Sequence, residues 1–165
     1  MSLLAGLIAV MFAALAQVSI LPSFSIFGAH PSLIIVLLVA WMSIRGQREA
    51  VVLIPIAGIL LGLLDGQPLG LAMLALAPLI LMTEVRELKV VDSDFIPALL
   101  LTVLGTGVYE ATSLVSLAVR GEPVSWLASI TDVLVPAAVA NALLLLPVYA
   151  VVRLASLDLR RPRAI

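Results

Sequence analysis

Long apolar stretches alternate with short polar segments along this chain. From residue 1 to residue 44 there is no Asp, Glu, Lys or Arg, and His30 is the only ionisable side chain. A membrane helix needs about 20 apolar residues to cross a hydrocarbon core of about 30 Å, so this stretch holds two spans. We expect the turn between them at Pro22 to Pro31, where prolines and a glycine interrupt a helix and phenylalanines anchor it at the headgroups.

Four further apolar stretches follow, which gives six predicted spans. The third and fourth have only about 15 residues each and would cover about 22 Å. They therefore cross as two short spans or form a re-entrant hairpin with Asp65 at membrane depth. A short interfacial helix, capped by Ser125 and carrying Trp126, is expected before the last span. The predicted spans are residues 3–21, 31–44, 50–64, 69–82, 95–119 and 132–152.

Positive charges are distributed unevenly among the predicted loops. If both ends of the chain face the cytoplasm, eight of the nine Lys and Arg residues lie on the inner side, and only Arg120 lies outside. The positive-inside rule therefore predicts cytoplasmic termini and an even number of crossings. A re-entrant hairpin would give the same distribution, so the number of crossings stays open between six and four.

Composition supports the same class of protein. The chain is 63% hydrophobic and 12% charged, with a net charge of −1, whereas a soluble domain carries about 25% charged residues. A water-soluble enzyme and a nucleic-acid-binding protein are both excluded on this ground. The chain has no cysteine and therefore no thiolate metal site or Cys nucleophile, and no motif for a cofactor is present. The sequence predicts one domain over residues 1–165, an all-α polytopic membrane helix bundle.

Four glycines follow one another at intervals of four residues. Residues i and i+4 share a face of a helix, so Gly58 and Gly62 would make a groove without side chains. Small residues let membrane helices approach closely. The groove either packs against a helix of the same chain or receives the helix of a partner, with Asp65 fixing the outer end of that helix. The glycines are Gly58, Gly62, Gly66 and Gly70.

Asp65 and Asp132 are predicted to lie at the same outer face of the membrane. Two such carboxylates could share a proton, as in an aspartyl protease of the lipoprotein signal peptidase type. The surroundings that those enzymes place around their aspartates are missing here. Asp132 also has a simpler role, because Ser129-x-x-Asp132 resembles a capping arrangement at a helix start. We therefore expect no catalytic residue.

A stripe of polar residues runs along the fifth predicted span and contains Glu110. Charged groups at membrane depth are costly, so they face a bundle interior, a cavity or a partner. Asn141, between two prolines of the last span, is a natural intramembrane partner, and Gln17 in the first span can hydrogen-bond across helices. The stripe comprises Thr102, Thr106, Tyr109 or Glu110, Ser113, and Ser116 or Leu117.

The order of several short motifs resembles the rod shape-determining protein MreD family over roughly residues 17–76. Gly28-Ala29-His30-Pro31-Ser32-Leu33 opens the second span, and Arg45-Gly46 follows it. Next comes a stretch similar to the family's Gly-Phe-x-x-Gly-Leu-Leu-x-Asp, here Gly58-Ile59-Leu60-Leu61-Gly62-Leu63-Leu64-Asp65, in which Ile stands in place of Phe. Pro68-Leu69-Gly70 closes the pattern after a shortened connection.

The resemblance implies a non-catalytic scaffold of the bacterial cell-elongation complex in the inner membrane, supporting lateral peptidoglycan synthesis and cell shape. Its expected partner is the membrane helix of MreC, and through MreC it would reach RodA and its class B penicillin-binding protein, with membrane lipids around it. The alternative is the substrate-binding membrane subunit of an energy-coupling-factor-type vitamin transporter. That alternative requires an outward cavity with convergent polar side chains, for which Tyr109, Glu110 and Asn141 are the candidates.

Overall fold

The computed structural model describes residues 2–20, 30–64, 70–81 and 95–158, which are helical and contain no strand. α4 and α5 follow one another with only Ala77 between them, and α7, η3 and α8 run on as one helix. The helical segments are α1 (Ser2–Ser19), α2 (Leu33–Arg45), α3 (Gln47–Leu64), α4 (Leu71–Leu76), α5 (Pro78–Leu81), α6 (Phe95–Val119), α7 (Trp126–Ser129), η3 (Ile130–Leu134) and α8 (Val135–Asp158).

The predicted all-α class is confirmed, and two helices are long and apolar enough to cross a membrane. They are Phe95–Val119 and Trp126–Ser156. The expected separate interfacial helix is wrong, because α7 continues through the π-helical turn η3 into α8. Ser125 occupies the N-cap position of α7, but its side chain makes no capping hydrogen bond.

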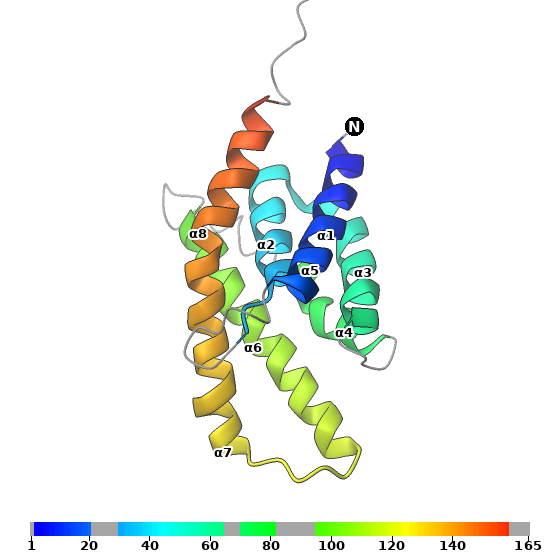
Figure 1. Ribbon diagram of the computed structural model, residues 1–165, viewed down its shortest axis with the longest axis vertical. Helices are drawn as coiled ribbons and strands as arrows, with labels where there is room; N and C mark the ends of the chain where they lie inside the picture. Colours follow the sequence, from blue (N-terminus) through cyan, green and yellow to red (C-terminus); the bar gives the residue numbers. More distant parts are fainter. Residues whose placement is uncertain (1, 21–29, 65–69, 82–94, 159–165) are drawn as a thin grey trace, which may run out of the picture.

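α2 is the central helix of the bundle. Its 13 residues are apolar except at its end, and those from Ile34 to Ser43 are all buried. A helix that is hydrophobic on every side must be surrounded by other helices, and α2 contacts α1, α3, α6 and α8. Figure 1 shows α2, in light blue, between α8 on one side and α1 and α3 on the other.

α6 and the α7–α8 helix extend beyond the rest of the bundle as a pair (Figure 1). Tyr109 is the last buried residue of α6, and Ala137 is the first buried residue of the helix that returns. We call residues 110–136 the distal hairpin. Its surface is mostly apolar, apart from charged residues near its tip, and the large apolar side chains that it exposes are Val115, Leu117, Val119, Trp126, Leu127, Ile130, Val133 and Val135.

Gly58 lets α3 and α4 approach closely. A Cβ atom added to Gly58 would lie 2.7 Å from the Cα of Met73, which is backbone and cannot move aside without separating the two helices. Small residues at such crossings replace the hydrophobic drive that lipid does not supply. The contact fixes α4 against α3 within this chain.

We predict that Gly58→Ala destabilises the protein by about 1–3 kcal/mol, the usual cost of overpacking a filled site. The matched control is Gly107→Ala in α6, where an added Cβ meets nothing within 4 Å. That change is expected to be neutral or slightly stabilising, because Ala favours a helix over Gly. Thermal unfolding of the detergent-solubilised protein measures both. Equal melting temperatures for the two variants would contradict the close α3–α4 contact.

Candidate functional site: the capped end of α2 and the distal hairpin

The N-terminus of α2 is capped by side chains from other helices. The first amides of any helix lack partners within that helix. Here the amide of Ser32 donates to Oδ1 of Asn141 in α8 at 2.6 Å, and the amide of Ile34 donates to Oε1 of Gln17 in α1 at 3.1 Å. Oγ of Ser32 also accepts from the amide of Ile35, at a long 3.5 Å. Three separate segments therefore meet at one helix end.

α6 supplies the remaining partner of this network. Nδ2 of Asn141 donates to Oγ1 of Thr106 at 2.9 Å, and Oγ1 of Thr106 donates to the carbonyl oxygen of Thr102 at 2.8 Å. Asn141 and Thr106 are each 1% exposed. Buried polar groups are costly unless they are paired, and each of these side chains has a partner. The prediction that Gln17 bonds across helices is confirmed by its bond to α2.

The capped helix end lies beside the middle of α6. Thr106 is the twelfth of the 25 residues of α6, so α6 continues for about 20 Å beyond it at 1.5 Å per residue. The position of the first predicted turn at the outer headgroups stays a prediction. At the end of that turn, Pro31 is buried in the bundle and Ser32 bonds to Asn141. His30 is exposed, and residues 21–29 lie outside the described residues.

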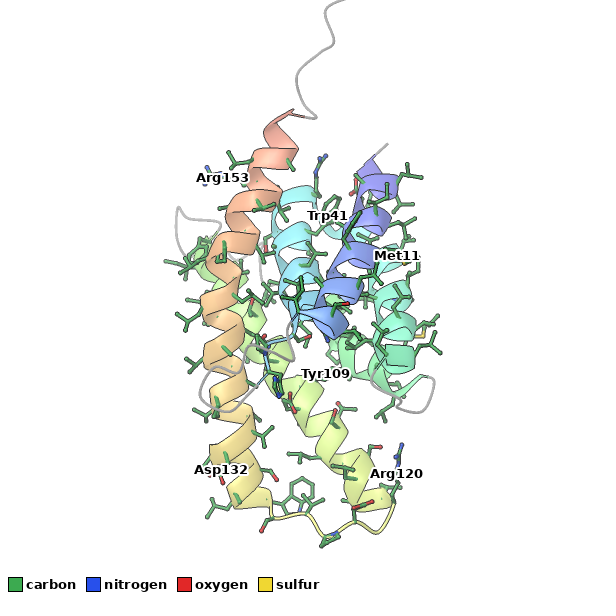
Figure 2. The ribbon with its side chains drawn as sticks, viewed as in Figure 1. Met11, Trp41, Tyr109, Arg120, Asp132 and Arg153 are labelled. Carbon is green, nitrogen blue, oxygen red and sulfur yellow. The ribbon has the colours of Figure 1, made fainter. Side chains whose placement is uncertain are left out.

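The predicted polar stripe of α6 divides at Tyr109. On the bundle side, Thr102, Thr106 and Tyr109 are buried. Beyond it, the stripe continues on the distal hairpin, where it is half-buried at Glu110, Ser113 and Ser116. Figure 2 shows Tyr109 where α6 leaves the bundle, with Arg120 and Asp132 near the far end of the hairpin. Half of the stripe thus belongs to the core and half to a surface.

The predicted glycine groove does not lie open as a row of four residues. Gly58 faces α4 of the same chain, and Gly62 is buried. The assignment of Gly58 to an open partner groove is therefore corrected, since a helix of this chain already occupies that face. Gly70 caps α4 with φ of +100°, and Asp65 and Gly66 lie outside the described residues.

Asp132 is exposed and lies inside the π-helical turn, where its Oδ1 accepts from Oγ1 of Thr131 at 2.9 Å. The expected capping role is wrong, because the helix begins at α7 and runs through this position. The proposed pairing with Asp65 lies outside the described residues. Within the described parts of the chain, no group of three or more His, Cys, Asp or Glu residues could hold a metal ion.

One contact at the opposite end of α2 was not predicted. Nε1 of Trp41 donates to Oε2 of Glu49 at 2.9 Å, and the guanidinium of Arg45 lies 5.6 Å from the centre of the Trp41 ring. The sequence predicts a polar turn at residues 45–49, whereas residues 47–49 form the first turn of α3. Trp41, Arg45 and Glu49 are spaced four residues apart, and this spacing is the feature of the sequence that could have predicted the contact. The contact joins the end of α2 to the start of α3.

Tyr109, Glu110 and Asn141 line neither of two pockets that the described residues form. A groove of about 490 Å³ between α1, α2 and α8 is lined by apolar residues such as Phe12, Leu37 and Pro147. A second pocket, between α6 and α8, contains none of the three candidates. Asn141 is directed to Ser32 and Thr106 instead. The chain matches no family model, no curated protein and no solved structure with which it was compared.

We predict that Asn141→Leu destabilises the bundle by about 1–3 kcal/mol, because it leaves the amide of the half-buried Ser32 without its acceptor. The control is Val139→Leu on the same helix, where the side chain is 42% exposed and no hydrogen bond is lost. Thermal unfolding in detergent compares the two variants. The capping role would be refuted if Asn141→Leu melted at the temperature of the control.

Proposed function

We propose that this chain is a non-catalytic, multi-pass scaffold of the bacterial inner membrane, similar to MreD, and that its distal hairpin binds the single membrane helix of an MreC-like partner. Through that partner it would assemble with RodA and a class B penicillin-binding protein. The observation that carries the proposal is the division of the α6 stripe, in which polar residues leave the core and continue onto the distal hairpin.

The chemistry of the distal hairpin supports a protein partner. Its outer surface is mostly apolar, with Val115 50% and Val119 83% exposed. An exposed apolar surface of this kind is typical of contact with another protein or with a membrane. Lipid suits those residues but not the half-buried Ser113 and Ser116, because polar groups facing hydrocarbon are costly. A second helix lying along the stripe would cover the polar groups and leave the apolar faces to lipid. Small Ser side chains also allow the close approach that membrane helices need.

Helix lengths support a mixed arrangement of spans. α6 has 25 residues and would reach about 37 Å, which is enough to cross the membrane. α4 and α5 together run only from Leu71 to Leu81 and would cover about 16 Å, which is too short for a crossing. In the proposal, α6 and α7–α8 cross fully, and α3 with α4–α5 forms the re-entrant pair. Both termini stay in the cytoplasm.

We expect Ser113→Leu to abolish co-purification of the MreC-like partner, because a bulky side chain holds the two helices apart. The matched control is Ala111→Leu, which adds similar bulk on an exposed position of the same helix that faces away from the stripe. Both positions lie beyond Tyr109, the last buried residue of α6, so both variants are expected to insert and to melt like the wild type. Undiminished co-purification with Ser113→Leu would overturn the placement of the partner.

The identity of the co-purified proteins tests the scaffold function itself. Affinity purification from native bacterial membranes is expected to recover a cell-wall synthase complex. Recovery of an ATPase coupling module would instead contradict the scaffold function and support the transporter subunit.

Membrane orientation has its own test, since the chain contains no cysteine. A membrane-impermeant maleimide added to intact spheroplasts is expected to label Ser125→Cys, at the start of α7, and to leave Ala155→Cys unlabelled until the membrane is opened. Both positions are exposed on the protein, so a difference reports the side of the membrane. Labelling of Ala155→Cys in intact spheroplasts would refute cytoplasmic termini.

A further inference from the structure

A pocket with one cation lies between the start of α6 and the last turns of α8. It has a volume of about 410 Å³, and its lining is Phe95, Leu146, Tyr149, Ala150, Arg153 and Leu154. Arg153 is the charged residue of the six. The rings of Phe95 and Tyr149 meet edge to face, with their centres 5.5 Å apart and their planes at 83°. The pocket therefore has an aromatic wall, an aliphatic part and a guanidinium.

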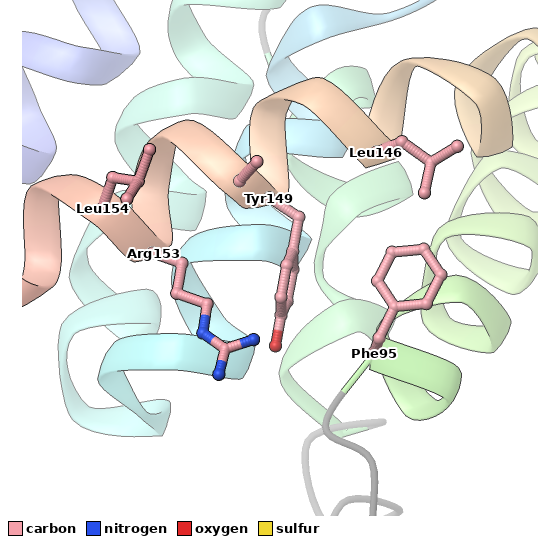
Figure 3. A pocket seen from close by; sticks show the side chains of 6 residues that line it. Phe95, Leu146, Tyr149, Arg153 and Leu154 are labelled. Carbon is pink, nitrogen blue, oxygen red and sulfur yellow. The ribbon is translucent and has the colours of Figure 1, made fainter.

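The lining residues of α8 form a single stripe along that helix. Positions i, i+3, i+4, i+7 and i+8 share one helix face, and the α8 residues of the pocket have this spacing from residue 146 to residue 154. Figure 3 shows the guanidinium of Arg153 and the hydroxyl of Tyr149 at the same end of the pocket, whereas Leu146 lies toward the other end, beside Phe95. The polar end and the apolar end are thus separated along the helix axis.

The position of Arg153 along the helix corresponds to a headgroup level. From Trp126 to Arg153 there are 27 residues, which is about 40 Å of helix, close to the 40–45 Å between the two polar faces of a bilayer. If Trp126 lies at the outer headgroups, where Trp is enriched, Arg153 lies at the inner ones. The apolar part of the pocket then points toward the membrane centre.

We propose that this pocket binds one anionic phospholipid of the inner leaflet. The phosphate is bound by the Arg153 guanidinium, which matches phosphate oxygens in charge and geometry, and an acyl chain lies along Leu146 and the Phe95 ring. Leu146 is 55% and Leu154 66% exposed, so the stripe is open to a lipid from the side. The assignment depends on the membrane placement in the proposed function, but not on the protein partner.

Lipid binding to the purified, delipidated full chain tests the assignment. Native mass spectrometry with phosphatidylglycerol is expected to show one retained lipid, with about tenfold weaker binding for Arg153→Ala, as for a lost hydrogen bond to a charged group. Arg153→Lys keeps the charge and should retain most of the binding. Arg120→Ala is the control, since Arg120 is an exposed arginine at the far end of the distal hairpin, and it should bind like the wild type.

Three results would overturn the assignment. The first is equal affinity for phosphatidylglycerol and phosphatidylcholine, and the second is unchanged phosphatidylglycerol binding by Arg153→Ala. The third is binding of glycerol phosphate as tight as that of the whole lipid, which would make the site one for free phosphate. Arg153→Ala should still co-purify the protein partner, because the pocket and the distal hairpin lie at opposite ends of α8. Failure of one proposal is therefore distinguishable from failure of the other.

Discussion

The N-terminal amides of α2 need hydrogen-bond acceptors that α2 itself does not provide. α2 is buried along nearly its whole length, and its first turn lies beside the middle of α6. A backbone group buried in a packed bundle without a hydrogen-bond partner costs about 1–3 kcal/mol. Asn141 and Gln17 meet this requirement with one side chain from α8 and one from α1. The same two bonds fix three helices relative to one another, so the rest of the bundle depends on them.

This constraint also explains why the bundle ends where it does. α2, α4 and α5 pack against the proximal half of α6, and the hydrogen bond between Asn141 and Thr106 lies at the end of that half. Beyond this level α6 has no buried residue after Tyr109 among the residues that the structure describes. Because α2 is short, its N-terminus needs capping inside the bundle, and the distal hairpin extends beyond it. The partner site and the lipid pocket that we propose lie at the two ends of the α6–α8 pair.

Periodicity and charge predicted the helical segments well, because long apolar stretches with polar breaks leave few alternatives. The all-α class followed from the hydrophobic pattern, and the hydrogen bond of Gln17 to another helix followed from its residue type. The sequence did not predict which parts of these helices lie side by side. Nothing in the sequence near Ser32 shows that this turn lies beside the middle of α6, because its acceptor, Asn141, is 109 residues away. Likewise, the spacing of the glycines could not reveal that the open side of Gly58 faces α4, which depends on how α3 and α4 pack.

The central claim is that the stripe on the distal hairpin lies against a membrane helix of another protein. Site-directed cross-linking tests it most directly, since the natural chain has no cysteine to give a background. Ser113→Cys, with a bifunctional thiol reagent and a single cysteine in the membrane helix of the MreC-like partner, is predicted to give a cross-linked adduct in native membranes. Ala111→Cys, on the opposite face of α6, is predicted to give none. Equal adducts from both positions, or none from Ser113→Cys, would contradict the claim.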